Sequence, residues 1–531
     1  MLEIFQSSFL LQASLSLCVI LIAIYAYFKR SFSYWNRRGV PSLNPSVPFG
    51  NFTKLRSNIE DYSKFYKKLH GKKIGGLYKF NKPILLLRDP EIIKNVLVKD
   101  FDLFYSRGIF VNEEKEPLVG NLFLLNGPKW KNLRAKLTPT FTSGKIKMMF
   151  PTLVQIGKEL QKCLKISADN EDAMEVKDIL SRYNTDIIAS CAFGIQCNSL
   201  ENPNTEFRVW GKKFFSPDFQ FIIKSILIII IPFLRKYLRI SLVSKNVSKY
   251  FRNMVKNTVE YRENNNVQRN DFMQLLIQLK NKTLGATEED PLLKIPDSSI
   301  TALKSNSPFD CLQNSEVTMD VIAAQAFVFF IGGFETSSTT ITFCLYELAL
   351  NPDIQETVQI EIDSVLKKYY GDITYEANVV QLTLVFLQLS KTLRKYPPAP
   401  VITRQCTQTT KLTGTDIVVE KGTAVHVPVL QIHHDPKYYL KPEKFDPERF
   451  SEEEKNKRRH FTFLPFGEGP RLCIGMRFGL MQTKVGVISI LSNYTVQVSA
   501  KTSIPLKIDP NSLILSPEGG MWLKITNRIN K

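Results

Sequence analysis

One cysteine in the sequence stands where a metal ligand could form. Cys473 lies in the stretch FGEGPRLCIG, residues 466–475, whose three glycines would let a flat ligand approach the backbone closely. An apolar run over 474–491 follows and is expected to be a helix. The positive end of a helix lowers the pKa of a nearby thiol, and the thiolate is the form that binds metals. Arg471 could bind an anionic group of the ligand bidentately. The alternative is a buried core cysteine.

An acid and an alcohol form a second candidate site. A long apolar helix is predicted to begin near Thr318, a suitable N-cap. Gly332 and Gly333 within it each cost about 1 kcal/mol relative to Ala, so something is expected to need the room. Glu335 and Thr336 follow directly, and buried polar groups need partners, which here could be a bound oxygen and waters. The alternative is a helix kink with the threonine bonded back to a carbonyl.

A third candidate pair lies in the basic segment KWKNLRAKL, residues 129–137. Trp130 and Arg134 are four residues apart and would share one face of a helix. The alternative, which is the more common one for such a pair, is an amphipathic surface helix.

The composition limits the class of protein. The 531 residues are 44% hydrophobic and include 36 Phe, which is ample for a large core. Eight cysteines without zinc-like pairing favour a reducing, cytosol-facing compartment. A net charge of +20 implies an anionic partner, but no dense basic run with interleaved aromatics occurs, so nucleic acid ranks last among the partners.

The N-terminus predicts a membrane anchor. Residues 9–28 form an apolar run about as long as a bilayer-spanning helix. A cleaved signal peptide is the alternative, but the start carries Glu3, and four basic residues follow the run between 29 and 38. Positive charge on this flank favours an uncleaved anchor with the body in the cytosol. Three prolines between 41 and 48 predict a stiff spacer between the anchor and the body.

Further along the chain, several elements can be placed. Residues 77–88 and 401–406 have strand character, and 382–396 is expected to be a helix ended by two prolines. The apolar segment 219–233 is too short and interrupted for a second span; it is predicted to dip into the bilayer, with a core helix as the alternative. The polar segment 281–316 is predicted to be a long surface loop.

The motifs together resemble those of one family. Residues 466–475 match Phe-x-x-Gly-x-Arg-x-Cys-x-Gly and resemble the haem-binding loop of the cytochrome P-450 monooxygenases. The resemblance covers nearly the whole chain and is closest to the microsomal, family-6-like branch of insects, in GVPSLNPSVPFGN, KWKNLRAKLTPTFTSGK and FGEGPRLCIGMRFGLMQTKVG. It implies a mainly α fold with small β-sheets. The expected division is an anchor at 1–30, a proline-rich hinge at 31–50 and one haem domain at 51–531.

The resemblance also implies the site. The cofactor would be haem b with Cys473 as its axial thiolate and only protein ligand. The other residues expected at the cofactor, mostly as partners of its carboxylates, are Phe466, Trp130, Arg134, Arg404 and Arg471. Glu335 and Thr336 would relay protons to the oxygen side of the haem, with Gly332 replacing the usual Ala of the motif.

The activity implied by the resemblance is monooxygenation of an apolar small molecule, a xenobiotic or an endogenous lipid-like compound. NADPH–cytochrome reductase would supply the electrons, with cytochrome b5 as a second candidate donor, and membrane lipid would be a further partner. The expected location is the endoplasmic reticulum membrane, with the catalytic domain facing the cytosol. The hairpin at 516–523 would reach the substrate pocket. A haem isomerase or dehydratase is the less favoured reading, because Glu335 and Thr336 are retained.

The sequence departs from the family pattern at one position. The expected Glu-x-x-Arg motif reads Lys391-x-x-Arg394, and its usual second partner is Arg449. Two like charges about 4 Å apart repel by about 4 kcal/mol at an intermediate dielectric. Lys391 is expected to turn out to solvent, to lose its proton or to destabilise the fold. The alternative function that follows is a catalytically impaired or non-catalytic haem-thiolate homologue.

Overall fold

The computed structural model describes residues 2–52, 59–109, 111–215, 241–281, 317–510 and 512–528. The predicted bilayer-dipping segment 219–233 lies outside the described residues, as does the predicted loop from residue 282 to 316. The described chain is mainly helical with small sheets, as the resemblance implied. It groups into two compact units, one of Met1–Gly108 with Val401–Gln431 and one of Ile109–Pro400 with Ile432–Lys531. The division into anchor, hinge and haem domain stays a prediction.

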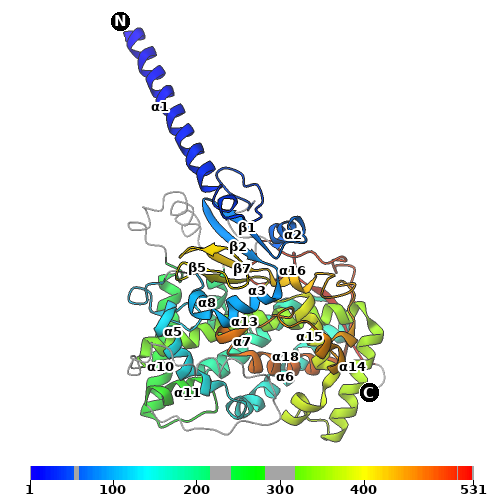
Figure 1. The fold of residues 1–531 in the computed structure, drawn as a ribbon. Coiled ribbons are helices and arrows are strands. Elements are labelled where there is room, and N and C mark those ends of the chain that lie inside the picture. Colours follow the sequence, from blue (N-terminus) through cyan, green and yellow to red (C-terminus); the bar gives the residue numbers. More distant parts are fainter. Residues whose placement is uncertain are drawn as a thin grey trace. The chain divides into compact units, whose positions relative to one another are not determined.

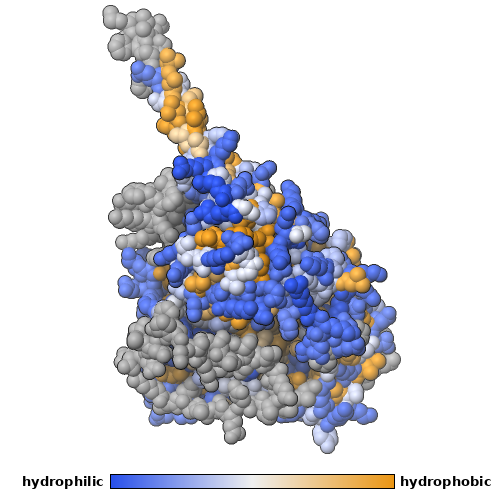
Figure 2. Space-filling view, in the orientation of Figure 1, coloured by the Kyte–Doolittle hydropathy of each residue, from blue (hydrophilic) through white to orange (hydrophobic). Residues whose placement is uncertain are grey.

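Unit 1 begins with the long helix α1, Leu2–Ser31. Its apolar side chains from Leu11 onward are exposed, and Figure 2 shows orange, hydrophobic residues along the coloured part of this helix. The stretch Leu11–Arg38 is long and apolar enough to cross a membrane. Lys29 and Arg30 occupy the last turn of α1. The apolar run at 9–28 is therefore helical, as predicted.

A four-stranded sheet follows in unit 1, with the order β1-β2-β7-β4; Figure 1 labels β1, β2 and β7 of this sheet. Its strands are β1 (Ile74–Lys79), β2 (Lys82–Leu87), β7 (Ala424–Val427) and β4 (Ile402–Gln405). The predicted strand at 77–88 is thus mostly the second half of a hairpin. The other elements of this unit are α2 (Ile59–Lys68), α3 (Pro90–Lys94), α4 (Phe101–Phe104), β5 (Thr410–Lys411) and β6 (Val418–Val419).

The residues after α1 are bound to this sheet. Trp35 is fully buried, and its Nε1 donates to the carbonyl of Leu77 at 3.0 Å. Gly76 donates to the carbonyl of Pro41 at 2.7 Å, and a Cβ on Gly76 would lie 2.3 Å from the Trp35 ring. This part of the predicted hinge is therefore docked on β1 instead of forming a free spacer.

Unit 2 holds most of the helices around the long helix α13, Met319–Leu350. The side chain of Thr318 caps α13, as predicted, and helix residues from Ile322 to Leu348 are largely buried. A helix that is apolar all round belongs in a core, which fits this burial. Figure 1 shows α13 beside α7 and α18. The helices of this unit are α5 (Gly127–Leu137), α6 (Ser143–Asn170), α7 (Val176–Ile188), α8 (Glu206–Phe215), α10 (Lys245–Asn264), α11 (Phe272–Lys280), α13, α14 (Pro352–Lys368), α15 (Thr383–Lys395), α17 (Glu452–Lys457) and α18 (Met476–Leu491); α16 (Val429–His433) joins the two units.

A three-stranded sheet, β3-β9-β8, completes unit 2. Its strands are β3 (Ala173–Glu175), β8 (Tyr494–Val498) and β9 (Trp522–Asn527). Gly519 and Gly520 precede β9 with positive φ angles of 74° and 86°, which favour glycine in the predicted C-terminal turn. Through β3, this sheet leads directly into α7.

Candidate functional site

Main-chain hydrogen bonds shape the loop that carries Cys473. Gly467 and Gly469 have φ angles of 76° and 73°, a conformation that other residues rarely adopt. The amide of Cys473 donates to the carbonyl of Phe466 at 3.1 Å, and α18 begins three residues later with Gly475 as its N-cap. Cys473 is exposed, so the alternative of a buried core cysteine is wrong. The thiol is available to a ligand near the positive end of a helix.

Arg471 ties this loop to the start of α5. Its guanidinium donates to the carbonyls of Leu125 at 2.7 Å and Phe123 at 3.4 Å. It also stacks over the ring of Trp130, 4.2 Å from the centroid. The Arg471 side chain therefore binds other residues of the protein. The sequence predicted only a contact with an anionic ligand for it.

Arg134 is a buried cation beside the cysteine. It is 6% exposed, and its Nε has no hydrogen-bond partner within the part of the chain that the structure describes. Burial lowers the pKa of Arg134, whereas the negative charge of Cys473 raises it. Trp130 is also buried, so the shared face of this pair packs inside the protein. A buried guanidinium with an unused donor suits an anionic group of a ligand.

Arg404 lies on β4, in unit 1. It is 3% exposed and donates to the carbonyl of Thr403 at 2.9 Å. Its Nε has no hydrogen-bond partner among the described residues, and burial lowers its pKa to about 10. The Nε–H group of Arg404 is thus an unused hydrogen-bond donor among the described residues, like that of Arg134.

The glycines of α13 have different surroundings. A Cβ on Gly333 would lie 2.5 Å from Cδ1 of Ile188 at the end of α7, so helix packing requires this glycine. A Cβ on Gly332 would meet no atom within 4 Å among the described residues. Thr336, on the same face as Gly332, donates to the Gly332 carbonyl at 2.6 Å, which is the back-bonding considered above as an alternative. The open face of α13 is therefore the face of Gly332 and Thr336.

Glu335 has a partner that the sequence did not suggest. Nζ of Lys177, in the first turn of α7, forms an ion pair with Oε1 of Glu335 and also hydrogen-bonds Oγ1 of Thr339 at 3.1 Å. The two charged side chains are 12% and 19% exposed. The sequence led us to expect bound oxygen and waters as partners of Glu335, whereas the structure shows a lysine as its partner. No local pattern around Lys177 marks it for this contact.

Lys391 does not turn out to solvent. It is 1% exposed, so that expectation is wrong. Its Nζ donates to Oε1 of Gln388 at 3.0 Å and lies 4.5 Å from the centroid of the Phe445 ring. An amide oxygen and an aromatic face both favour a cation, so the side chain finds polar contacts inside the fold.

The two arginines near Lys391 bind main-chain carbonyls. Arg394 donates to His433 at 3.0 Å and to Pro442 at 2.7 Å. Arg449 donates to the Lys441 carbonyl at 3.0 Å. Burial lowers the pKa of Arg394 to about 10, and the charge of Arg449 acts in the same direction. Both arginines therefore hold the segment 433–442 through carbonyl oxygens.

These side chains fit a haem. An exposed thiol in a glycine-shaped loop can ligate an iron, and the buried Arg134 beside it offers an unused donor to a carboxylate. The fit rests on Cys473 and Arg134 in unit 2, with Arg404 offering a similar donor in unit 1.

Comparison with known proteins agrees with this fit. A sequence model of the family described as Cytochrome P450 matches residues 40–524. The chain is 40% identical over 519 residues to "Probable cytochrome P450 6a14" of Drosophila melanogaster, covering 96% of this chain and 98% of that protein. It is also 40% identical over 518 residues to "Cytochrome P450 6k1" of Blattella germanica, covering 97% of each. The chain is therefore a haem-binding monooxygenase with cysteine-thiolate ligation, and it belongs to the cytochrome P450 family.

Proposed function

We propose that the protein is a membrane-bound monooxygenase that inserts one atom of O2 into an apolar small molecule, with electrons from NADPH delivered by a reductase. The observation that carries the proposal is the exposed Cys473 thiol beside the buried Arg134. When bound, the haem would supply the oxygen chemistry. The protein's part is to hold the haem, to enclose the substrate and to move protons.

Each candidate residue has a role in this proposal. Cys473 is the iron ligand, and its thiolate form is favoured by the N-terminus of α18. Trp130, Arg134 and Arg404 hold the carboxylates of the haem. Arg471 also binds a carboxylate of the haem and fixes the loop through the carbonyl of Leu125. The carbonyl of Phe466 accepts a hydrogen bond from the amide of Cys473.

Glu335 and Thr336 are the proposed proton-transfer groups. Positioned acids and bases of this kind contribute about 10²–10⁴-fold to a rate. The Thr336 hydroxyl lies on the open face of α13, where its hydrogen bond to the Gly332 carbonyl orients it. Glu335 is held at the side by Lys177.

A reduced, carbon-monoxide difference spectrum of the purified protein tests the cofactor and its ligand together. We expect the thiolate type of spectrum, and then NADPH-dependent oxidation of apolar compounds when the reductase is added. A protein fully loaded with haem but without the thiolate type of spectrum would contradict the role of Cys473. The alternative, a non-catalytic haem-thiolate homologue, predicts the spectrum without any turnover.

We also propose that residues 1–30 anchor the protein in the endoplasmic reticulum membrane with residues 51–531 as a haem domain in the cytosol. The exposed apolar side chains of α1 and the basic residues after it support this orientation. Lipid, the reductase and cytochrome b5 are then the expected partners. Protease added to sealed microsomes should digest the body of the protein. Protection of the body would show that it faces the lumen and that the proposed orientation is wrong.

A further inference from the structure

The inference concerns Lys177, the partner of Glu335, and it rests on the proposed role of Glu335 in proton transfer. Successive residues of a helix point about 100° apart, whereas residues four apart share a face. Glu335 and Thr339 therefore share the face toward α7, and both contact Nζ of Lys177. Thr336 lies on the neighbouring face with Gly332. The acid and the alcohol are adjacent in sequence but are held by different surroundings.

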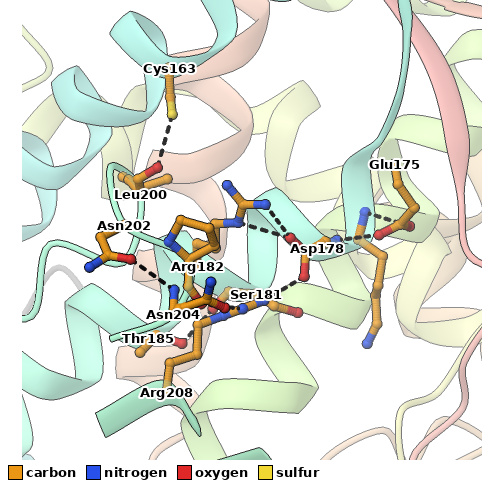
Figure 3. Close-up of polar contacts among 12 residues, drawn as sticks. Cys163, Glu175, Asp178, Ser181, Arg182, Thr185, Leu200, Asn202, Asn204 and Arg208 are labelled. Carbon is orange, nitrogen blue, oxygen red and sulfur yellow. Dashed lines mark hydrogen bonds and ion pairs between the residues drawn. The ribbon is translucent and has the colours of Figure 1, made fainter. Parts of the chain in front are cut away.

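The turn that presents Lys177 is itself tightly fixed. The carboxylate of Glu175 caps α7 by accepting from the amides of Lys177 at 3.1 Å and Asp178 at 2.6 Å (Figure 3). The same carboxylate accepts from the amide of Met521 at 2.7 Å, next to the glycine turn before β9. The first turn of α7 is therefore bound to the C-terminal hairpin.

The same turn is bound to α8. Asp178 accepts hydrogen bonds from Arg182 at 2.6 Å and from the buried Arg208 of α8 at 2.5 Å (Figure 3). Burial alone would raise the pKa of Asp178, but these arginines hold the pKa at about 2. Asp178 is thus a carboxylate at neutral pH, and the attachment of α8 persists over the physiological range.

We infer that Lys177 is a positioning residue for proton transfer, which holds the Glu335 carboxylate against α7 and links its position to the C-terminal hairpin and α8. Glu335 can serve the open face of α13 only from a defined position, because proton transfer requires hydrogen-bond reach directly or through one water. Without the ammonium of Lys177, a partly buried carboxylate loses its cation and its fixed orientation.

The test compares Lys177→Met and Lys177→Arg in the full-length, haem-loaded protein with reductase. Lys177→Met keeps much of the side-chain length but loses the charge. We expect the product formed per NADPH and the kcat for product formation each to fall about 10-fold, which is a smaller loss than the removal of a proton-transfer group causes. KM should stay within about twofold, because the apolar substrate does not contact this lysine on the proposed role. Lys177→Arg should restore most of the yield. Lys212→Met, a more exposed partner of Asp178, is the matched control and should behave as wild type.

A double-variant cycle separates positioning from simple stabilisation. In the Glu335→Gln background, Lys177→Met should have no further effect on product per NADPH, because its target has been neutralised. The melting temperatures should follow the same cycle, with the double variant losing less than the sum of the single losses; this readout needs no turnover.

Two outcomes would overturn the inference. If Lys177→Met keeps the wild-type yield while Glu335→Gln loses it, Lys177 does not position the acid, although the proposed function stands. If Lys177→Met lowers the yield equally in both backgrounds, the lysine acts apart from Glu335. A wild-type protein that binds haem but forms no product would instead contradict the proposed function, and the melting cycle would still report on the ion pair.

Discussion

The cysteine loop and the middle of α13 are held in different ways. In the loop, the acceptors are main-chain carbonyls: the amide of Cys473 donates to the carbonyl of Phe466, and the guanidinium of Arg471 donates to the carbonyl of Leu125. In α13, Glu335 is held by the side chain of Lys177, which lies 158 residues away in the sequence. Because carbonyls are present whatever the side chains are, the loop should tolerate changes of the residues that Arg471 contacts, whereas a change of either Lys177 or Glu335 releases the acid. We expect changes in the loop to alter haem content and changes in α13 to alter the use of electrons.

The largest effect is expected at Cys473 itself. Cys473→Ala removes the proposed iron ligand, so the thiolate type of carbon-monoxide difference spectrum and all product formation should disappear. Cys163→Ala, which leaves the loop untouched, is the control. An unchanged spectrum in Cys473→Ala would end the assignment of this cysteine.

Arg471 tests whether the loop depends on main-chain contacts. Arg471→Lys replaces a planar fork by a single ammonium, so the carbonyls of Phe123 and Leu125 are left poorly satisfied. Each buried unsatisfied group costs about 1–3 kcal/mol, so we expect a lower melting temperature and less bound haem per polypeptide. Arg477→Lys is the matched control. If the haem-free protein is not destabilised, Arg471 acts on the haem alone.

Lys484 lies in α18, which runs from the cysteine loop to a contact with α13. Burial lowers its pKa to about 8, with Glu361 opposing the shift. The folded state therefore releases the proton at lower pH than the unfolded state, and stability should rise between pH 8 and about 10.4, by roughly 3 kcal/mol at most.

Lys484→Met removes this buried charge. We expect a higher melting temperature at pH 7 and a flatter dependence between pH 8 and 10. Lys165→Met, at an exposed position of α6, should leave the pH dependence unchanged. Parallel curves for wild type and Lys484→Met would show that folding does not lower the pKa of Lys484.

Thr336 tests the α13 side of the comparison. Thr336→Ala should leave haem and substrate binding intact while lowering product per NADPH by about 100-fold and increasing peroxide, because the open face loses its hydroxyl. Thr340→Ala is a close control, since Thr340 bonds back to the carbonyl of Thr336 at 2.8 Å in the same manner. Equal losses in both variants would indicate a structural role.

The smallest effect is expected at Lys391. Lys391→Glu places a carboxylate near Arg394 and Arg449, which gains attraction but loses the cation–π contact with Phe445, worth about 2 kcal/mol when buried. We expect a net rise of a few degrees in melting temperature and a larger haem-loaded fraction, with Lys391→Gln between the two. A wild type that loads haem fully and melts no lower would remove the support for the non-catalytic alternative.

Local spacing predicted much of the fold and of the candidate site. The cap at Thr318, the glycine loop before α18 and the four-residue spacing of Trp130 and Arg134 all depend on neighbours in sequence. These features follow from helix geometry and backbone conformation, which a short segment determines by itself.

The contacts between distant segments could not be predicted in this way. Lys177 meets Glu335 because α7 packs on α13, and Gly333 is required by Ile188 for the same reason. A turn of Lys391 to solvent was one of the outcomes expected from the sequence, but its ammonium lies over the ring of Phe445 inside the fold. Such contacts depend on the tertiary packing, which no spacing pattern near these residues encodes.

The docking of Trp35 on β1 has a practical consequence for producing the protein without its anchor. Tyr78 donates from its hydroxyl to the carbonyl of Phe32 and accepts from the amide of Trp35, and Gly76 leaves space for the indole ring. A shortened chain that starts at or before Phe32 keeps Trp35 packed on β1. One that starts after Pro41 would bare the apolar surface around Leu77 to water, so the soluble form would aggregate even though the membrane helix is gone.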